Sequence, residues 1–353
     1  RLLVNIFFQK IPSLSEQPMV TKIFRPPQGN ARGQTTSEAT TLLVIVLETF
    51  TSLVAILPSK YKIDIIPIAF YVYISIVLDS KFQKELVSQV LMNIKLLCVN
   101  IESQFEEELF ENFSPTVKST ISSMISKLSL IMSQNERNED NVSIIKNGML
   151  ATVLLFTSCP KSCVQMHTSQ KNFTEILNKG FYSENATISI TSLQCTRTLI
   201  LLSSKQTNMI LTNNDISESM KISHNFTKAL MPQVILFIKS LNEKYKNHVF
   251  SQDEASVLNV VEESVKTLLT INAAAQDSQR TEIMAITLPI LIYLLTDSSL
   301  EKYSQPDVPT LHKISITHIL SLAGLQPQNF RETVAALSPE QKTKLEAAIK
   351  FNE

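Results

Sequence analysis

The chain has 353 residues with 32 basic and 32 acidic side chains, so its formal net charge is zero. This balance argues against a dedicated nucleic-acid-binding protein, which would carry a basic stripe. Apolar residues make up 44% of the chain, which excludes overall disorder, and five glycines leave few positions for tight turns or phosphate-cradling loops. The composition favours helices joined by short polar links.

The N-terminal residues differ from the rest of the chain. Residues 1–10, "RLLVNIFFQK", are typical of the end of a preceding helix. Residues 11–35 contain four prolines and two of the five glycines, which predicts a loop or linker. Because the chain starts at Arg1 without an initiator Met, we expect a fragment of a longer protein. Residues 36–353 are predicted to form one helical domain.

Helix-start signals recur along the chain, each a capping side chain followed three residues later by a glutamate. They are Thr35 with Glu38, Asp215 with Glu218, and Ser251 with Glu254; Ser114 followed by Pro115 predicts a further start. Apolar stripes with three- and four-residue spacing follow these signals: Val46, Phe50, Leu53 and Leu57; Val117, Ile121, Met124, Leu128 and Ile131; Leu258, Val261, Val265 and Leu268. Strand-like alternation over more than five residues is hard to find, so the predicted fold class is all-α.

A proline recurs before a long apolar run in three places, at Pro67, Pro232 and Pro289. Such a proline can start or bend a helix, and the runs that follow are apolar on more than one side. Helices buried on both flanks are typical of an α-solenoid. We therefore predict a solenoid of degenerate HEAT-like hairpins, with roughly six or seven helix pairs. An irregular helical bundle is the alternative.

The two most apolar stretches, 42–57 and 65–78, are short for a membrane span. The first carries Glu48, and the second is bounded by Asp64 and Asp79. A bilayer span needs about 20 apolar residues. Buried helices are therefore predicted and no transmembrane span, although a span is the alternative reading.

No familiar catalytic or phosphate-binding motif is present. The five histidines are scattered, and we predict no catalytic, cofactor-binding or metal-binding residues and no cofactor; an enzyme with an unfamiliar site is the alternative. "CPKSC", Cys159 to Cys163 with His167 beyond it, raises a metal site as an alternative, but no second ligand pair has suitable spacing. The four cysteines, which also include Cys98 and Cys195, are predicted to be idle thiols in a reducing compartment.

Two further patterns have both a functional and an ordinary interpretation. Residues 102–111, "ESQFEEELFE", could be an acidic-aromatic partner-binding helix, but an amphipathic helix with a solvated acidic face is favoured. The sequons begin at Asn141, Asn172, Asn185 and Asn225. In a chain rich in Asn, Ser and Thr, they are expected by chance.

The C-terminal residues 309–353 are predicted to form short capping helices. Leu311, Ile314, Ile319 and Leu322 mark the first helix, which Gly324 can close in the left-handed conformation. Phe330, Val334 and Leu337 mark the second. Ser338 with Gln341 forms a capping box for the last, with Pro339 in its first turn. Its narrow stripe of Leu345, Ala348 and Ile349 must lie against an earlier helix, so these helices would seal the end of a solenoid.

This stretch also resembles the C-terminal end of the HEAT repeat-containing protein five family. The positions that carry the resemblance are Leu311, His312, Leu320, Gly324, Pro327, Phe330, Arg331, Pro339, Lys344, Leu345, Glu346, Ala348 and Ile349. "GLQPQNF" lengthens the step between glycine and proline. The motif is helical rather than catalytic, so it transfers no site residues.

The resemblance implies a non-enzymatic scaffold that forms the C-terminal part of a large cytoplasmic α-solenoid. Its implied partners are proteins: the clathrin adaptor complex and its accessory proteins. The implied role is endosome-to-Golgi and trans-Golgi vesicle trafficking, with peripheral association at the trans-Golgi network and endosomes through partners. Which residues bind partners is unknown from the motif. The alternative is an importin-like or phosphatase-scaffold-like receptor that binds peptides or a partner subunit.

Overall fold

The computed structural model describes residues 37–79, 84–102, 107–134, 139–159, 164, 166–202, 213–246, 254–275, 277–295 and 308–351. All regular elements within these ranges are helices, which confirms the all-α prediction. The predicted helix end at 1–10 and the predicted linker at 11–35 lie outside the described residues. Contacts divide the chain into two compact units, Arg1–Ile176 and Leu177–Glu353.

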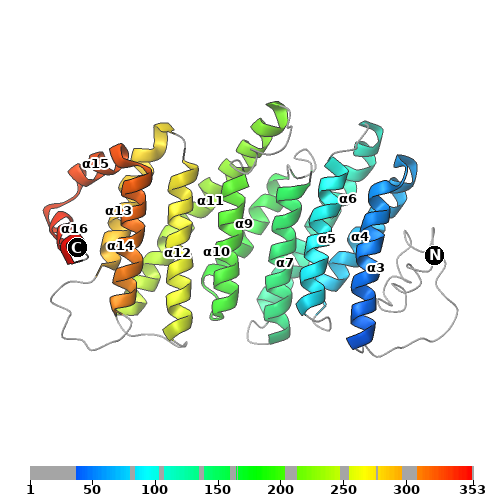
Figure 1. The fold of residues 1–353 in the computed structure, drawn as a ribbon, viewed down its shortest axis with the longest axis horizontal. Coiled ribbons are helices and arrows are strands. Elements are labelled where there is room, and N and C mark those ends of the chain that lie inside the picture. The colour runs from blue at the N-terminus through cyan, green and yellow to red at the C-terminus, as the bar shows by residue number, and fades with distance from the viewer. Residues whose placement is uncertain are drawn as a thin grey trace. The chain divides into compact units, whose positions relative to one another are not determined.

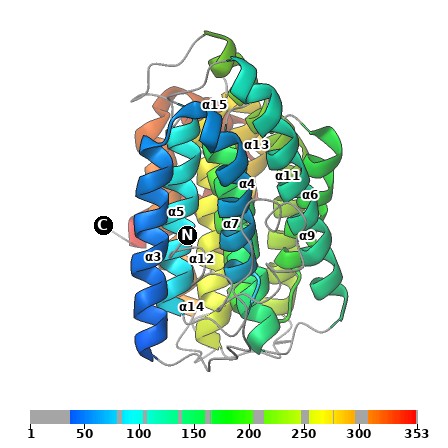
Figure 2. The same cartoon turned by 90° about the vertical axis from the view of Figure 1, so that its right-hand side faces the viewer.

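Unit 1 is built from long helices arranged in two layers. Its elements are α3 (Ser37–Ile56), α4 (Ser59–Val77), α5 (Lys84–Glu102), α6 (Glu107–Gln134), α7 (Glu139–Ser158) and the first part of α9 (His167–Phe181). α3 contacts α5 and α5 contacts α7, forming one layer, while α4 contacts α6 in the other (Figure 1). Figure 2 shows α3 and α5 side by side on one side of this unit and α6 on the other.

Unit 2 continues with the same alternation. Its elements are the end of α9, α10 (Ala186–Ile200), α11 (Asn213–Lys246), α12 (Glu254–Ala274), the 3-10 turn η3 (Asp277–Gln279), α13 (Arg280–Leu294), α14 (Val308–Leu325), α15 (Pro327–Ala336) and α16 (Pro339–Phe351). α10, α12 and α14 contact in sequence in one layer, and α11, α13 and α15 in the other. From α10 to α13, each helix therefore packs against its chain neighbour and against the next helix of its own layer. This is the packing of an α-solenoid of degenerate helical hairpins.

Large apolar side chains fill the space between the layers of unit 1. Phe70 and Tyr73 of α4 are fully buried, and Tyr73 hydrogen-bonds the Thr51 hydroxyl of α3. The rings of Phe156 and Phe173 stack with their centroids 5.7 Å apart. At Gly148 of α7, a Cβ atom would lie 2.6 Å from Leu128 Cδ2, so glycine allows α6 and α7 to approach closely.

The core of unit 2 combines apolar packing with buried polar links. Phe181 stacks on Phe237 at 5.8 Å, and α13 buries Leu288 and Leu291 completely. The Asn272 amide on α12 donates to Thr287 Oγ1 of α13 at 2.8 Å. Gln326, between α14 and α15, donates to the backbone oxygen of Asn272 at 3.1 Å. These hydrogen bonds join α12 to α13 and to the link between α14 and α15.

Three predicted helix boundaries are wrong. Ser114 and Pro115 do not start a helix, because α6 begins at Glu107 and Pro115 lies inside it. Asp215 lies two residues inside α11, so it does not cap that helix. Gly324 does not close α14 in a left-handed conformation, because the helix continues to Leu325 and Gln326 provides the break instead.

The other start signals are partly described. α3 begins at Ser37 and α12 at Glu254, while Thr35 and Ser251 lie outside the described residues. Most residues of the predicted stripes are nevertheless buried, including Val46, Ile121 and Val265. Leu53 is an exception, because its side chain is 41% exposed. The stripes therefore identify most of the inward-facing residues, although Leu53 was wrongly assigned to the inward face of α3.

The C-terminal capping box is confirmed. Gln341 Nα donates to the Ser338 hydroxyl at 3.2 Å, and Ser338 Nα donates to Gln341 Oε1 at 3.1 Å. Pro339 takes the first helical position, and Leu345 and Ala348 are buried. Contacts between α16 and α13 place this short stripe against an earlier helix.

Candidate protein-binding surface

The described cysteines are structural. Cys159 and Cys195 are buried, and burial raises the pKa of the Cys195 thiol to about 12. A thiol with so high a pKa stays protonated at neutral pH and is a poor nucleophile or metal ligand. The remainder of "CPKSC" and the side chain of Cys98 lie outside the described residues. Within the described ranges, no group of three or more His, Cys, Asp or Glu side chains is arranged to hold a metal ion.

The described histidines do not converge on one another. His167 at the start of α9 and His224 in α11 are exposed. His312 and His318 lie on α14, where burial lowers the pKa of both, and Lys344 lowers that of His312 further. Around His318, Glu262 raises the pKa and Lys266 lowers it. His248 lies outside the described residues.

A hydroxyl-rich hollow of about 460 Å³ lies in unit 1 between α6 and α9. It is lined by Ser122, Ile125, Ser126, Met166, His167, Thr168, Ser169 and Asn172. Ser122 and Ser169 lie within hydrogen-bonding distance of each other, at 3.3 Å. None of the lining residues is a carboxylate that could orient His167 as a general base. The hollow therefore lacks the arrangement of a hydrolase triad.

The structure places the sequons on helices, and it leaves the interpretation of the acidic-aromatic segment as a prediction. Asn185 is the N-cap of α10, where its side chain accepts a hydrogen bond from Thr187 N at 3.0 Å. Asn172 is exposed on α9, and Asn141 and Asn225 lie within α7 and α11. In 102–111, residues 103–106 and the side chains of the segment are outside the described part of the structure.

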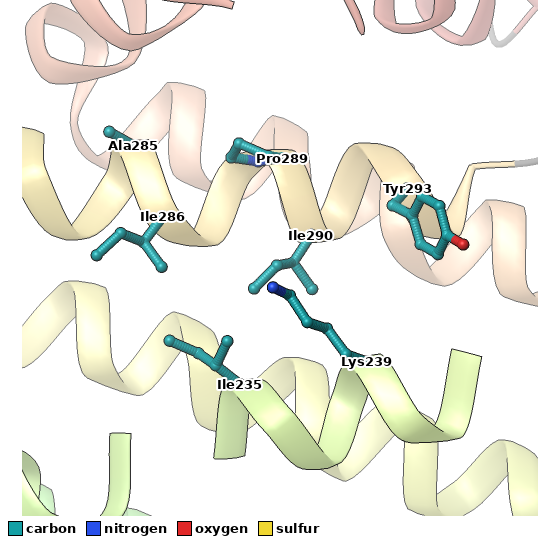
Figure 3. Close-up of a pocket in the computed structure, with 7 residues that line it drawn as sticks. All are labelled: Ile235, Lys239, Ala285, Ile286, Pro289, Ile290 and Tyr293. Carbon is teal, nitrogen blue, oxygen red and sulfur yellow. The ribbon is translucent and has the colours of Figure 1, made fainter. Parts of the chain in front are cut away.

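An apolar groove lies in unit 2 between α11 and α13, two helices of the same layer. Its volume is about 430 Å³, and it is lined by Ile235, Lys239, Ala285, Ile286, Pro289, Ile290 and Tyr293. Figure 3 shows Ile286 and Ile290 projecting from α13 toward α11, with Ile235 facing them. The Lys239 side chain reaches from α11 toward Ile290.

The groove exposes hydrophobic side chains that the core does not use. Of the lining residues, Ile286 is 48% exposed and Tyr293 is 44% exposed. Isolated exposed apolar residues are common, but exposed apolar side chains that line a hollow indicate an interaction surface. The sequence contained one signal for it, because Pro232 and Pro289 belong to the recurrent proline-led runs. That signal predicted repeats, not a groove.

Residues 167–353 match a protein family described as LAA1-like, C-terminal TPR repeats. The match covers more than half of the chain. The chain belongs to the LAA1-like family. The matched region includes all of unit 2 and therefore the whole α11–α13 groove.

Membership of the LAA1-like family agrees with the observed helical repeats. TPR and HEAT repeats are both antiparallel helix pairs that stack on their neighbours, so the family description and the predicted HEAT-like hairpins share one architecture. Within the described ranges, none of the helices combines the length and the hydropathy needed to cross a bilayer. This LAA1-like chain thus offers helical surfaces for protein–protein interaction.

Proposed function

We propose that this chain is part of a non-enzymatic scaffold that binds protein partners along its helical layers. The observation that carries the proposal is the exposed apolar groove on a layer of stacked helices within the LAA1-like region. Stacked repeats create extended surfaces without requiring a reaction centre. Residues 36–353 would form the scaffold, and residues 309–353 would cap its end.

The trafficking role is the finer part of the proposal. It is supported by the LAA1-like family match together with the C-terminal resemblance to the HEAT repeat-containing protein five family. The partners would be the clathrin adaptor complex and its accessory proteins. The chain would be cytoplasmic and would associate peripherally with the trans-Golgi network and endosomes through these partners.

Affinity capture from cytosol with quantitative mass spectrometry tests this role. The full 353-residue chain is the bait, and an unrelated helical-repeat protein of similar size is the control bait. We expect adaptor subunits or their accessory proteins to be enriched over the control. Repeated failure to recover any of them would remove the trafficking assignment. Recovery of a Ran-type GTPase or a phosphatase catalytic subunit in their place would favour the receptor-type alternative.

A further inference from the structure

We propose that the α11–α13 groove binds an amphipathic, acidic peptide segment of a protein partner, with apolar anchors over Ile286 and Ile290 and a carboxylate near Lys239. The inference rests on the proposed scaffold function and specifies the chemistry of its partner. Helix-in-groove binding of this kind reads apolar anchors at three- and four-residue spacing.

α11 and α13, the two helices that border the groove, repeat one surface pattern. When Pro232 of α11 is aligned with Pro289 of α13, Leu236 and Tyr293 both fall four residues later, and both are exposed. Ala229 and Ile286 both fall three residues earlier and are also exposed. The recurrence therefore places apolar side chains outward on two helices of one layer. Of these four residues, Ile286 and Tyr293 line the groove itself.

Proline also changes the backbone that borders the groove. Pro289 has no N–H, so it cannot donate to the carbonyl oxygen of Ala285 four residues earlier. Both residues line the groove. A proline ring at this position presents an apolar surface to a ligand, and it costs the helix one of its regular hydrogen bonds. Tertiary packing tolerates that loss here because Leu288 and Leu291, on the opposite face, are fully buried.

Charge selects the class of partner. Over residues 220–241, α11 carries Lys221, Lys228, Lys239 and His224 but no Asp or Glu. All three lysines are exposed, and no described carboxylate forms an ion pair with them.

The charges on α13 do not oppose this pattern within the groove. The acidic residue Glu282 precedes the groove, and Arg280 is paired with Asp277 at 2.8 Å. Over residues 220–241, α11 is therefore basic, and a segment carrying Asp or Glu beside its apolar anchors complements this stretch.

Two synthetic peptides of about 18 residues, the length of a typical recognition helix, are the probes. Both carry leucines at three- and four-residue spacing; the charged positions are glutamate in one and lysine in the other. Binding to the full chain is measured by fluorescence anisotropy. We expect the acidic peptide to bind roughly tenfold more tightly than the basic one, with a preference that weakens as salt rises.

Two groove variants and two matched controls locate the binding site. Ile286→Asp should weaken the acidic peptide roughly tenfold by placing a charge among the apolar anchors. Lys239→Glu should remove the preference for the acidic peptide. The controls Leu320→Asp and Lys313→Glu alter α14, where Leu320 is 50% exposed and Lys313 is exposed. The controls should bind as the unchanged chain does, and thermal melting followed by circular dichroism checks that every variant is folded.

Several results would overturn the inference. Equal affinity for the two peptides would contradict a preference for an acidic segment. Unchanged binding by both groove variants would show that the peptide binds outside the groove. A doubled mass in light scattering that Ile286→Asp abolishes would make the groove a contact between two copies. Binding to phosphatidylserine-containing vesicles is measured for the same proteins. If the groove variants lose vesicle binding but keep peptide binding, the groove is a lipid contact.

The capture experiment separates this inference from the scaffold function. If the unchanged chain and both groove variants recover adaptor subunits equally, the groove assignment is wrong and the trafficking function stands. If the unchanged chain recovers none, the trafficking function fails whatever the peptides show. Recovery that is lost in both groove variants but retained in both controls supports the two together.

Discussion

Gly148 and Gly324 both lie in helices, but neighbouring side chains crowd Gly148 and leave open space around Gly324. A Cβ atom at Gly148 would lie 2.6 Å from Leu128 Cδ2 and 3.0 Å from Leu78 Cδ2, whereas at Gly324 it would meet nothing within 4 Å. Glycine lowers helix stability relative to alanine. At Gly148 this cost is offset by close packing of α6 against α7, while at Gly324 nothing offsets it.

Substitution of the two glycines should therefore change the free energy of unfolding in opposite directions, with alanine tested in the open space at Gly324 and the larger valine at the crowded Gly148. Gly324→Ala should raise the free energy of unfolding by up to about 1 kcal/mol, because it sits near the end of α14 with open space around it. Gly148→Val should lower it by about 1–3 kcal/mol, because the side chain would crowd Leu128. Urea denaturation monitored by circular dichroism measures both. Equal responses at the two positions would contradict the close approach of α6 and α7.

The two histidines of α14 predict a loss of stability in acid. Burial lowers the pKa of His312 and His318 below the ordinary histidine value of 6.5, so the unfolded chain binds protons more readily than the folded chain. The free energy of unfolding is therefore unaffected by these two histidines above pH 6.5, where both are neutral, and it decreases as the pH falls below 6.5. His312→Gln with His318→Gln should reduce the drop in melting temperature between pH 7 and pH 5. An unchanged drop would show that other groups dominate this range.

At the scale of single helices, α16 depends on its first turn. The Ser338–Gln341 capping box satisfies two backbone N–H groups, and Lys342 Nζ donates to Ala335 O at 2.7 Å, linking α16 to the end of α15. Only Leu345 and Ala348 are buried by α16 within its described side chains. Because α16 buries so little apolar surface, the capping box contributes a large share of the stability of this helix.

Ser338→Ala should destabilise α16 by about 1 kcal/mol, because the Gln341 N–H loses its acceptor. Amide hydrogen exchange should accelerate in α16 while α12 is unchanged. Thr343→Ala is the matched control, since that exposed hydroxyl only bonds Pro339 O within its own helix. Similar acceleration in both variants would argue against a role for the cap.

Helix positions are the part of the fold that the sequence predicted well. Apolar spacing is local, so the buried faces of Val46, Ile121 and Val265 could be identified from the chain alone. Boundaries failed where two local interpretations compete. Pro115 is acceptable at a helix start, but α6 extends back to Glu107 and includes it. Gly324 permits a left-handed end but does not require one, and α14 continues past it.

The candidate site could not be predicted in the same way. Its residues come from α11 and α13, which are separated in the chain by the whole of α12. Whether Ile235 faces Ile286 depends on which helices share a layer, and that is decided by packing over long sequence distances. The proline recurrence marked the two helices but carried no information on their contact.

At the scale of the whole molecule, the helical layers predict that a destabilising substitution affects neighbouring helices and not the whole chain equally. In a repeat array each element contacts only its neighbours, so damage at one element spreads a limited distance. α13 contacts α11, α12, α14, α15 and α16, all within unit 2. A single globular core would instead lose stability throughout.

Hydrogen exchange of a Leu291→Ala variant tests this central claim most directly. Leu291 is fully buried on α13, and its truncation should cost about 2–5 kcal/mol where its contacts are lost. We predict faster exchange in α11 through α16 and unchanged exchange in α3 through α6. Equal acceleration over both units would contradict an array of stacked helix pairs and the scaffold function proposed from it.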